Sequence, residues 1–305
     1  MNRQIIKITY AIGLVCLLLA CNNNKTDVNK NDDPGKTSHR VLSCNIRVAL
    51  PQDSIKGVGW DKRKDVCIDV IKKQEADIIC VQEMLKVQYV DFCKAFPAYF
   101  SFGFIGPEMD EFSEGYHGIA KNVVFFSKDR YELKSAGNYW LSETPHIAGS
   151  LSWGSARARH CNWVRIFDKY TEKEFRVMNI HLDHIAQVAK EAQIRMIIEE
   201  AKQYQEDFPQ LLVGDFNANI YNDVIHLVRS AGWVDIYAEM DPENPNVNSY
   251  HGFKGLHDDS GDSGRIDFIF SFGPIKPVSS ELITDKIGDM YPSDHFFLMA
   301  DVEIN

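Results

Sequence analysis

The stretch "QLLVGDFNAN" (residues 210–219) joins a buried strand to side chains suited to chemistry. Its apolar run predicts a strand covered on both faces, because short continuous apolar segments that end at a glycine are typical of such strands. The strand leads into Asp215 and Asn217 rather than into further core residues. A carboxylate and a carboxamide at the end of a buried strand indicate a site that binds a ligand or handles protons.

The same arrangement recurs along the chain. Six further polar residues stand at or beside the ends of apolar segments predicted to be strands: Asn45, Glu83, His181, Asp267, Asp294 and His295. Each has an ordinary structural explanation when taken alone, such as a turn former, a helix cap or a core histidine. Because ligand sites in α/β proteins gather beyond strand ends, we expect the set to converge on one site.

Strands and amphipathic helices are mixed along the sequence, which predicts sheets covered by helices. We expect strands over 40–46, 76–83, 121–127, 160–167, 174–182, 210–216, 265–271 and 296–304, and helices over 61–75, 185–204 and 222–232. The helix 185–204 has the clearest period, which predicts one buried face made of Ile185, Val188, Ala189, Ala192, Met196 and Ala201.

Six ordered segments resemble the motifs of the endonuclease/exonuclease/phosphatase superfamily: "SCNIR", "ICVQE", "NIHLDH", "GDFNA", "RIDFIF" and "PSDHF". The resemblance covers nearly all of residues 40–305. It implies an α/β fold that is a four-layer sandwich, in which two mostly antiparallel sheets pack face to face with helices outside. It also implies a metal-dependent hydrolase of phosphoester bonds that uses an activated water.

The resemblance implies a role for each strand-end residue. Glu83, with Asn45 beside it, would hold Mg²⁺, for which Mn²⁺ is a possible substitute, because hard oxygen ligands suit this ion. Asp294 is either a further metal ligand or a structural acid.

The catalytic residues implied by the same resemblance are His181, Asp215, Asn217, Asp267 and His295. Either Asp215 or His295 would accept the proton of the attacking water, and Asp267 would orient His295. His181 and Asn217 would donate to phosphate oxygens, where charge must be stabilised.

Substrate contacts are predicted from two further segments. In "SARARHCNWVR", Arg159 is the candidate for gripping a phosphate, since a guanidinium binds phosphate with two parallel hydrogen bonds. Asn122 is a second candidate phosphate contact. Ala120 replaces an acidic residue that is usual in a bacterial branch of the superfamily, so His181 is expected to be oriented differently, through Glu143 or Asp183.

Three features have two interpretations each. The segment "WLSETPHIAGSLSW" (140–153) is either a rim loop over the site or a surface connection on which Trp140 packs down. Tyr250 and Phe253 are either stacking surfaces or core residues. Cys44, Cys67, Cys80, Cys93 and Cys161 are interpreted as small core residues, with a disulfide permitted but not implied.

The charge balance bears on the substrate. The chain has 305 residues and a net charge of −10, which disfavours strong sequence-independent attraction to nucleic acid or anionic lipid. Three substrate classes remain open: nucleic acid, a phospholipid, and a sugar or inositol phosphate. A sphingomyelinase-like phospholipid phosphodiesterase is one alternative, and a non-catalytic ligand-binding surface lipoprotein on the same fold is another.

The first residues predict export. Residues 1–20 are expected to be a lipoprotein signal peptide, because a basic start and a short apolar stretch precede "LLAC". We expect lipid on Cys21, a flexible tether over 21–39, and a single domain over 40–305. The chain would then be a monomer held at the membrane of the bacterial cell envelope, periplasmic or exposed at the surface.

Overall fold

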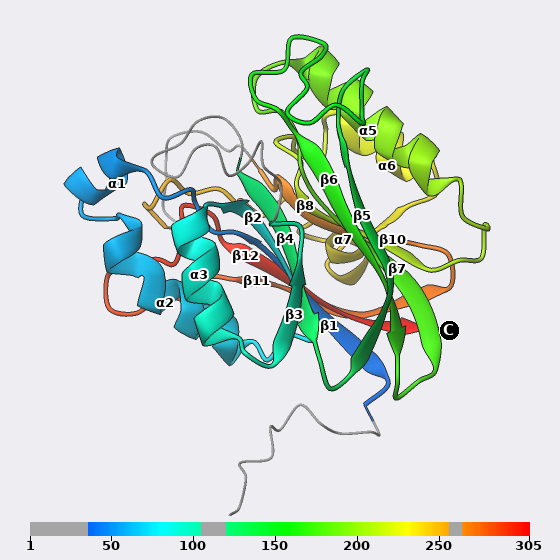
Figure 1. Cartoon of the computed structure of the whole chain (residues 1–305), viewed down its shortest axis with the longest axis horizontal. Helices are drawn as coiled ribbons and strands as arrows, with labels where there is room; N and C mark the ends of the chain where they lie inside the picture. Colours follow the sequence, from blue (N-terminus) through cyan, green and yellow to red (C-terminus); the bar gives the residue numbers. More distant parts are fainter. Residues whose placement is uncertain (1–35, 105–119, 256–263) are drawn as a thin grey trace, which may run out of the picture.

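Two six-stranded sheets form the centre of the computed structural model, which describes residues 36–104, 120–255 and 264–305 (Figure 1). The first sheet has the strand order β11 (Ile275–Ile283), β12 (Phe297–Ile304), β1 (Ser38–Asn45), β2 (Ile78–Met84), β4 (Lys121–Ser127), β3 (Tyr99–Phe102). The second has the order β5 (Tyr131–Trp140), β6 (His160–Asp168), β7 (Lys173–His181), β8 (Gln210–Asp215), β10 (Asp267–Phe272), β9 (Val234–Asp235).

Each sheet contains one parallel pair of strands at its centre. β1 runs parallel to β2 and β7 runs parallel to β8, whereas the other neighbours are antiparallel. A parallel pair ends at one edge of its sheet, so each pair delivers two strand ends to the same place. These four ends carry Asn45, Glu83, His181 and Asp215 at or next to them.

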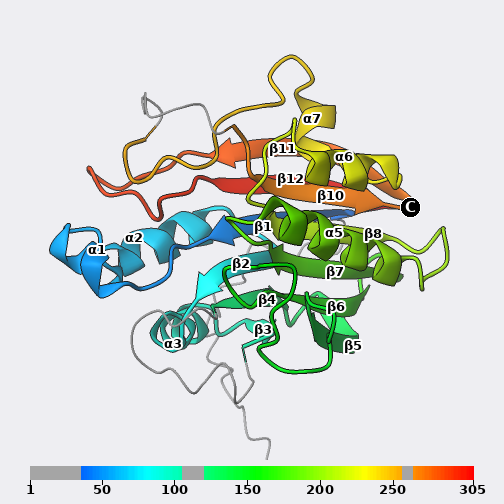
Figure 2. The ribbon, with the colours of Figure 1, turned by 90° about the horizontal axis from the view of Figure 1, so that it is seen from above.

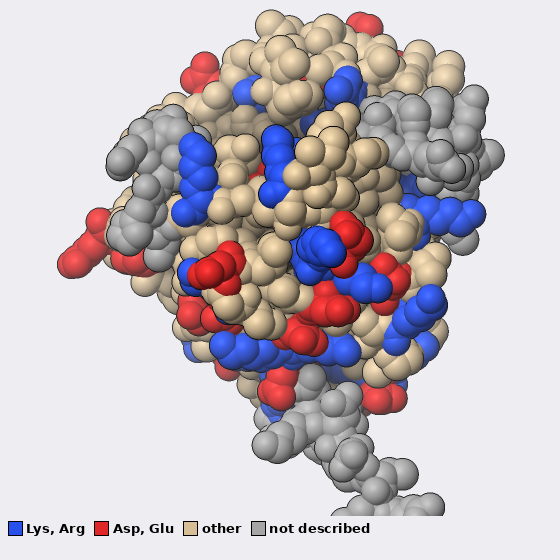
Figure 3. Space-filling model, turned by 90° about the vertical axis from the view of Figure 1, so that its left-hand side faces the viewer, with Lys and Arg blue, Asp and Glu red and all other residues tan. Residues whose placement is uncertain are grey.

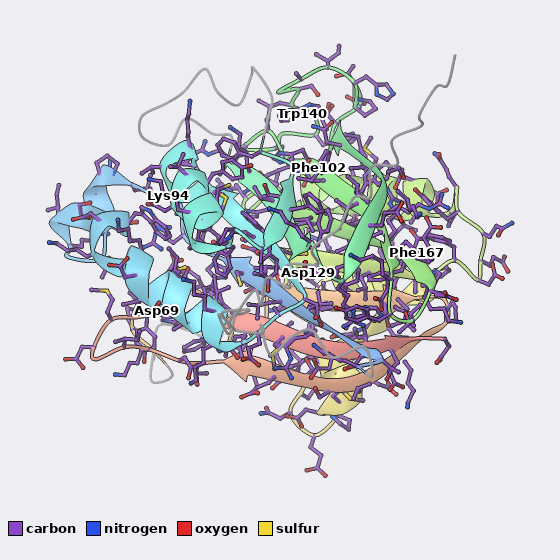
Figure 4. The ribbon with its side chains drawn as sticks, turned by 60° about the horizontal axis from the view of Figure 1, so that its bottom comes forward. Asp69, Lys94, Phe102, Asp129, Trp140 and Phe167 are labelled. Carbon is purple, nitrogen blue, oxygen red and sulfur yellow. The ribbon has the colours of Figure 1, made fainter. Side chains whose placement is uncertain are left out.

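Six helices surround the sheets in the described part of the chain: α1 (Pro51–Ile55), α2 (Trp60–Lys73), α3 (Lys86–Ala95), α5 (Gln187–Ala201), α6 (Asp223–Ser230) and α7 (Ile236–Met240). Figures 1 and 2 show α1, α2 and α3 outside the first sheet and α5 and α6 outside the second. In Figure 4, Asp69 marks α2, Lys94 marks α3 and Phe167 marks β6.

The buried apolar residues form three layers that match this order. One layer lies between the sheets, as Val41 and Ile78 of the first sheet and Val177 of the second show. A second layer joins the first sheet to α2 and α3, and a third joins the second sheet to α5 and α6. Strand side chains alternate between opposite faces, so neighbouring residues of one strand serve different layers. The predicted four-layer α/β sandwich is confirmed.

Several elements were not expected from the sequence. β3, β5 and β11 lie at sheet edges, and much of β5 and β11 is exposed, so their apolar signal is weak. α1, α3 and α7 were also missed. The predicted helix 185–204 forms over a shorter range, and Ile185 and Val188 are exposed rather than buried. Its buried side instead includes Ile194 and Ile197, which pack against the second sheet. Contact with that sheet decides which side of the helix is buried, and the helical period alone does not specify it.

The predicted tether and cysteines need two corrections. β1 begins at Ser38, and His39 is fully buried, so the last two residues of the expected tether belong to the fold. Residues 1–35, with the expected signal peptide and Cys21, lie outside the described residues. Cys93 is exposed, whereas the other four cysteines of the domain are buried as expected, and all five are free thiols. Across residues 36–104, 120–255 and 264–305, no helix is long and apolar enough to span a membrane.

Candidate active site

The second sheet places three of the predicted site residues side by side. His181 of β7 and Asp267 of β10 both pair in register with Asp215 of β8. Gly214 is required immediately before Asp215, because its φ is +146° and a Cβ atom there would lie 2.0 Å from the carbonyl oxygen of Ile180. This close approach of β8 to β7 explains the glycine in "VGDF".

The first sheet contributes Asn45 and Glu83 to the same place. The Nδ2 of Asn45 donates to Oδ2 of Asp215 at 2.9 Å and to Oε1 of Glu83 at 3.2 Å, and thus links the two sheets. Oε2 of Glu83 accepts from the backbone N–H of Val48 at 2.7 Å. Glu83 has a φ of +65°, a backbone conformation that costs about 1–3 kcal/mol and tends to occur at functional sites.

A cavity of about 300 Å³ lies where these strand ends meet. Its walls differ in charge. Glu83, Asp215 and Asp294 contribute carboxylates to the lining, and Arg157 and Arg159 contribute guanidinium groups. His181, Asn217 and His295 also line it. The predicted convergence is therefore observed, and the cavity suits an anion bound beside a cation.

His295 is held by a buried hydrogen-bonded chain. Its Nδ1 lies 2.9 Å from Oδ2 of Asp267, which also accepts from the hydroxyl of Ser249 at 2.8 Å. Burial alone would lower the pKa of His295, but the charge and hydrogen bond of Asp267 outweigh it and raise the pKa to about 10. His295 is therefore protonated at neutral pH, as expected for a histidine oriented by Asp267.

Asp215 occupies the centre of the site. Its Oδ2 lies 3.4 Å from Nε2 of His181 and 3.9 Å from Nε2 of His295. Burial, reinforced by the charge of Asp267, raises the pKa of Asp215 to about 7 against the opposing effect of His295. Burial and the charge of Arg159 lower the pKa of His181, so this ring is neutral at neutral pH. A carboxylate with a pKa near the working pH suits a general base.

Two groups of side chains offer ligand atoms for a metal ion. Among the described residues, Asp215, Asp267 and His295 bring their donor atoms within 4.8 Å of one another. In this group the Nδ1 of His295 is already bonded to Asp267 at 2.9 Å, an arrangement that favours proton handling by the histidine. Glu83 and Asp294 remain, both lining the cavity with hard carboxylate oxygens of the kind that Mg²⁺ prefers.

Asn45 does not present its oxygen as predicted. Its Oδ1 accepts from the backbone N–H of Arg47 at 3.0 Å, so the Nδ2 is the atom that faces the carboxylates. The residue therefore orients Glu83 and Asp215 and is not itself placed as a ligand. Asp294 pairs with Arg47, whose Nη1 is 3.2 Å from its Oδ2.

The two predicted phosphate contacts have different outcomes. Arg159 lines the cavity, with its Nη2 3.4 Å from Nδ1 of His184. Asn122 is buried, does not line the cavity, and donates from its Nδ2 to the backbone oxygen of His160 at 2.9 Å. It therefore links β4 of the first sheet to β6 of the second behind the site, which corrects the prediction.

Asn217 combines a structural and a lining position. Its Nδ2 donates to the carbonyl of Leu182 at 3.1 Å, and its backbone N–H donates to Oδ1 of Asp215 at 2.8 Å. An amide nitrogen carries two hydrogens, so the second remains for a phosphate oxygen.

The expected support of His181 by Glu143 or Asp183 is not what the structure shows. Asp183 caps the following turn by accepting from the backbone N–H groups of Ile185 and Ala186, while Glu143 is exposed. His181 faces Asp215 instead. Trp140 is buried, with its ring 5.3 Å from that of His160, so this tryptophan of the 140–153 segment packs down (Figure 4).

Sequence reasoning gave no role to several residues that build the site. Arg47 and His184 line the cavity, and Arg63 and Ser249 hold its walls from behind. Arg47 and His184 stand inside the quoted segments "SCNIR" and "NIHLDH", so their proximity to Asn45 and His181 was the available signal. Arg63 and Ser249 carry no such signal, since their contacts are with remote segments.

Comparison with known proteins places this geometry in a family. Residues 42–295 match the model of the Endonuclease/Exonuclease/phosphatase family. A mannosyl-6-phosphatase from Bacteroides thetaiotaomicron is 28% identical with a TM-score of 0.75, over 87% of this chain and 99% of that one. An endonuclease/exonuclease/phosphatase from Bacteroides vulgatus is also 28% identical, with a TM-score of 0.76, over 88% and 100% of the two chains.

A more distant relative is Nocturnin of Drosophila melanogaster, 26% identical over 84% of this chain and 44% of that protein. This chain therefore spans less than half the length of that relative. The family match covers most of the sequence and includes all the strand-end site residues from Asn45 to His295. The chain belongs to the endonuclease/exonuclease/phosphatase family, whose members are hydrolases that act on phosphoester bonds.

Proposed function

We propose that this chain hydrolyses the phosphoester of a small phosphorylated compound by metal-assisted attack of water. The observation that carries the proposal is the single cavity in which Asp215, protonated His295 and Glu83 face Arg157 and Arg159. Its volume of about 300 Å³ is at the lower end of the ~300–1,000 Å³ common for small-molecule sites.

The residues of the chain supply binding and proton transfer. Arg159 and Arg157 hold the anionic phosphate, and His295 donates a hydrogen bond to an oxygen on which charge develops. Asp215 takes a proton from the attacking water, whose oxygen bonds to phosphorus as the bond to the leaving oxygen breaks; the leaving alkoxide then takes up a proton from solvent water and departs as the alcohol. The pKa of about 7 lets Asp215 accept this proton and release it again near neutral pH.

Glu83 and Asp294 would hold the divalent cation, with Asn45 orienting Glu83. Bound there, Mg²⁺ would polarise a phosphoryl oxygen and stabilise the charge of the leaving group. The carboxylate ligands favour Mg²⁺, or Mn²⁺ in its place, over softer ions.

A sugar phosphate is the substrate class we favour. The similarity to a mannosyl-6-phosphatase over almost the whole of both chains supports it, as does the small cavity. On the face shown in Figure 3, Lys and Arg lie among Asp and Glu in the lower half and as separate patches in the upper half, so the coloured residues form no continuous basic stripe of the kind a nucleic acid needs.

The test combines variants with a substrate panel. Asp215→Asn and His295→Ala are expected to reduce hydrolysis by about 10²–10⁴-fold while circular dichroism shows a retained fold. The panel contains mannose 6-phosphate, inositol phosphates, bis-p-nitrophenyl phosphate, sphingomyelin, RNA and plasmid DNA, each with Mg²⁺ and with EDTA. Near-normal rates in both variants, or no hydrolysis of any substrate by the wild type, would refute the proposal. If the wild type hydrolyses no substrate and its thermal stability does not change with Mg²⁺ or EDTA, a non-catalytic ligand-binding protein would be favoured.

We also propose that Cys21 carries a lipid that anchors the protein in the bacterial envelope. The support is the "LLAC" sequence after a short apolar segment. Incorporation of labelled palmitate into the wild type, and its loss in Cys21→Ser, is the expected result. Equal labelling of both would contradict the anchor.

A further inference from the structure

A second pocket adjoins the catalytic cavity. It also has a volume of about 300 Å³, and it shares Arg47, Tyr250 and Asp294 with the first. The residues that line only the second pocket include Lys56 and Phe253. Because Arg47, Tyr250 and Asp294 line both pockets, the two spaces meet at these residues.

Arg47 cannot make the second pocket an anion site. Its Nε lies 2.8 Å from Oδ2 of Asp53 and its Nη1 lies 3.2 Å from Oδ2 of Asp294. The two carboxylates also line the pocket, where they balance Arg47 and Lys56. The side chains that line the pocket therefore offer a second phosphate no net positive charge, the cation that Asp294 would share with the catalytic cavity not being counted. The pocket instead offers hydrogen-bond donors and acceptors of both kinds, which suits neutral hydroxyl groups.

Two aromatic rings complete the pocket. Tyr250 is 39% exposed, and its ring packs edge-on against His295 with the centroids 5.1 Å apart. Phe253 is partly buried, and the guanidinium of Arg63 lies 5.9 Å from its ring centroid. Phe253 has a φ of +66°, an unfavourable conformation for a bulky side chain. Such strain is retained where the surrounding structure holds a side chain in place for a function.

The second pocket lies on the side of the cavity from which the leaving group is expected to depart. None of Asp215, Asn217, Arg157 and Arg159 lines it, whereas Asp294, one of the two proposed cation ligands, does. Glu83 and Asp294 would hold the cation where it could stabilise the leaving oxygen, while water would attack from the opposite side of phosphorus. The leaving group thus departs on the side of Asp294.

We infer that the pocket formed by Arg47, Asp53, Lys56, Tyr250, Phe253 and Asp294 is the leaving-group subsite, and that it binds a neutral polyhydroxylated ring such as a hexose. This inference rests on the proposed function and adds the part of the site that selects the alcohol. Tyr250 and Phe253 cover apolar C–H surface of the ring, while Lys56 and Asp53 bond to its hydroxyl groups.

The test compares two substrates in three variants. Mannose 6-phosphate fills the subsite with hydroxyl groups, and p-nitrophenyl phosphate places a ring without hydroxyl groups there. Lys56→Ala is expected to raise KM for mannose 6-phosphate about 5–10-fold with a change of less than 2-fold in kcat, and to change KM for p-nitrophenyl phosphate much less. Phe253→Ala is expected to raise KM for both substrates. Lys62→Ala, an exposed lysine outside both pockets, is the matched control and should change neither constant.

Two outcomes would overturn the inference. One is an equal effect of Lys56→Ala on both substrates, and the other is no effect on either. Inositol monophosphate and adenosine 5′-monophosphate extend the comparison. A nucleotide preferred over both sugar phosphates would also overturn the choice of a polyol ring. If the wild type hydrolyses none of these compounds, the proposed function itself fails. If the wild type is active and the subsite variants behave like it, only the inference about the subsite fails.

Discussion

Arg63 tests how the loop that carries Asp294, a proposed cation ligand, is held beside the loop that follows Asn45. It is fully buried on α2, and its guanidinium donates to backbone oxygens of three segments, the third through its Nε to Val58 just before α2. Nη1 donates to Ile46 and Pro292, and Nη2 donates to Arg47. Pro292 lies two residues before Asp294, while Ile46 and Arg47 follow Asn45. One side chain therefore ties the loop of Asn45 to the loop of Asp294.

The change Arg63→Met keeps much of the side-chain stem and removes the donors. The carbonyls of Ile46, Val58 and Pro292 lose this partner, while that of Arg47 keeps the Nε2 of Gln88 at 2.8 Å. An unsatisfied buried carbonyl costs about 1–3 kcal/mol. Taking the lower value for each of these three carbonyls, the change should reduce the free energy of unfolding by on the order of 3 kcal/mol.

Loosened loops should also bind the cation less tightly. Loss of groups that orient metal ligands typically reduces metal affinity about 10–100-fold, and we expect a rise of this size in the dissociation constant for Mn²⁺. The assay is isothermal titration calorimetry with Mn²⁺, beside urea unfolding of the same variant. Binding of the ion is thus measured without reference to turnover.

Arg176→Met is the matched control. Arg176 is also fully buried, and it pairs in register with Gln210 at the end of β8 that is opposite Asp215. It donates to Glu200 at 2.8 Å, so its loss should destabilise the fold and leave Mn²⁺ binding unchanged. If Arg63→Met binds Mn²⁺ as the wild type does, or if the control weakens binding equally, the positioning role of Arg63 is wrong.

Three further predictions concern the frame of the site. Gly214→Ala should lower the free energy of unfolding by at least about 1–3 kcal/mol in urea titrations, because a Cβ would lie 2.0 Å from the Ile180 oxygen; a change under about 0.5 kcal/mol would contradict the clash. Asn122→Ala should destabilise the protein by about 1–3 kcal/mol without changing KM, since it leaves the His160 oxygen unpaired; a raised KM at unchanged stability would restore its predicted phosphate role. Asp168 is buried, yet Arg130 lowers its pKa, so its contribution to stability is present above about pH 4 and disappears as the pH falls through the lowered value. Asp168→Asn should therefore have a lower free energy of unfolding than the wild type at pH 7, and this difference should shrink as the pH falls. A difference that does not depend on pH would exclude the Asp168–Arg130 ion pair as the source of the lost stability.

The sequence predicted the central strands because their signal is local. A strand such as β8, covered on both faces, must be apolar along its length, so the polar residues that follow it stand out. Edge strands such as β5 lack this contrast, since one side of each meets solvent, and they were missed. The helix period was detected over 185–204, but the period does not specify which side meets the sheet. Val188 was consequently assigned to the wrong face.

The candidate site also has one part that the sequence predicts and another that depends on the tertiary structure. Asp215, Glu83 and His295 were identified from the sequence, because a polar group at the end of an apolar strand is visible in a few consecutive residues. The roles of these groups depend on segments far apart in the chain. Asp267 raises the pKa of His295 to about 10, and the amide of Asn45 turns its nitrogen toward the carboxylates. Such effects depend on distances of a few ångströms between remote residues, which only the tertiary structure sets. The sequence alone thus identified the strand-end groups that meet at the site, and the fold decided which further residues join them and which group carries a proton, orients a neighbour or faces the substrate.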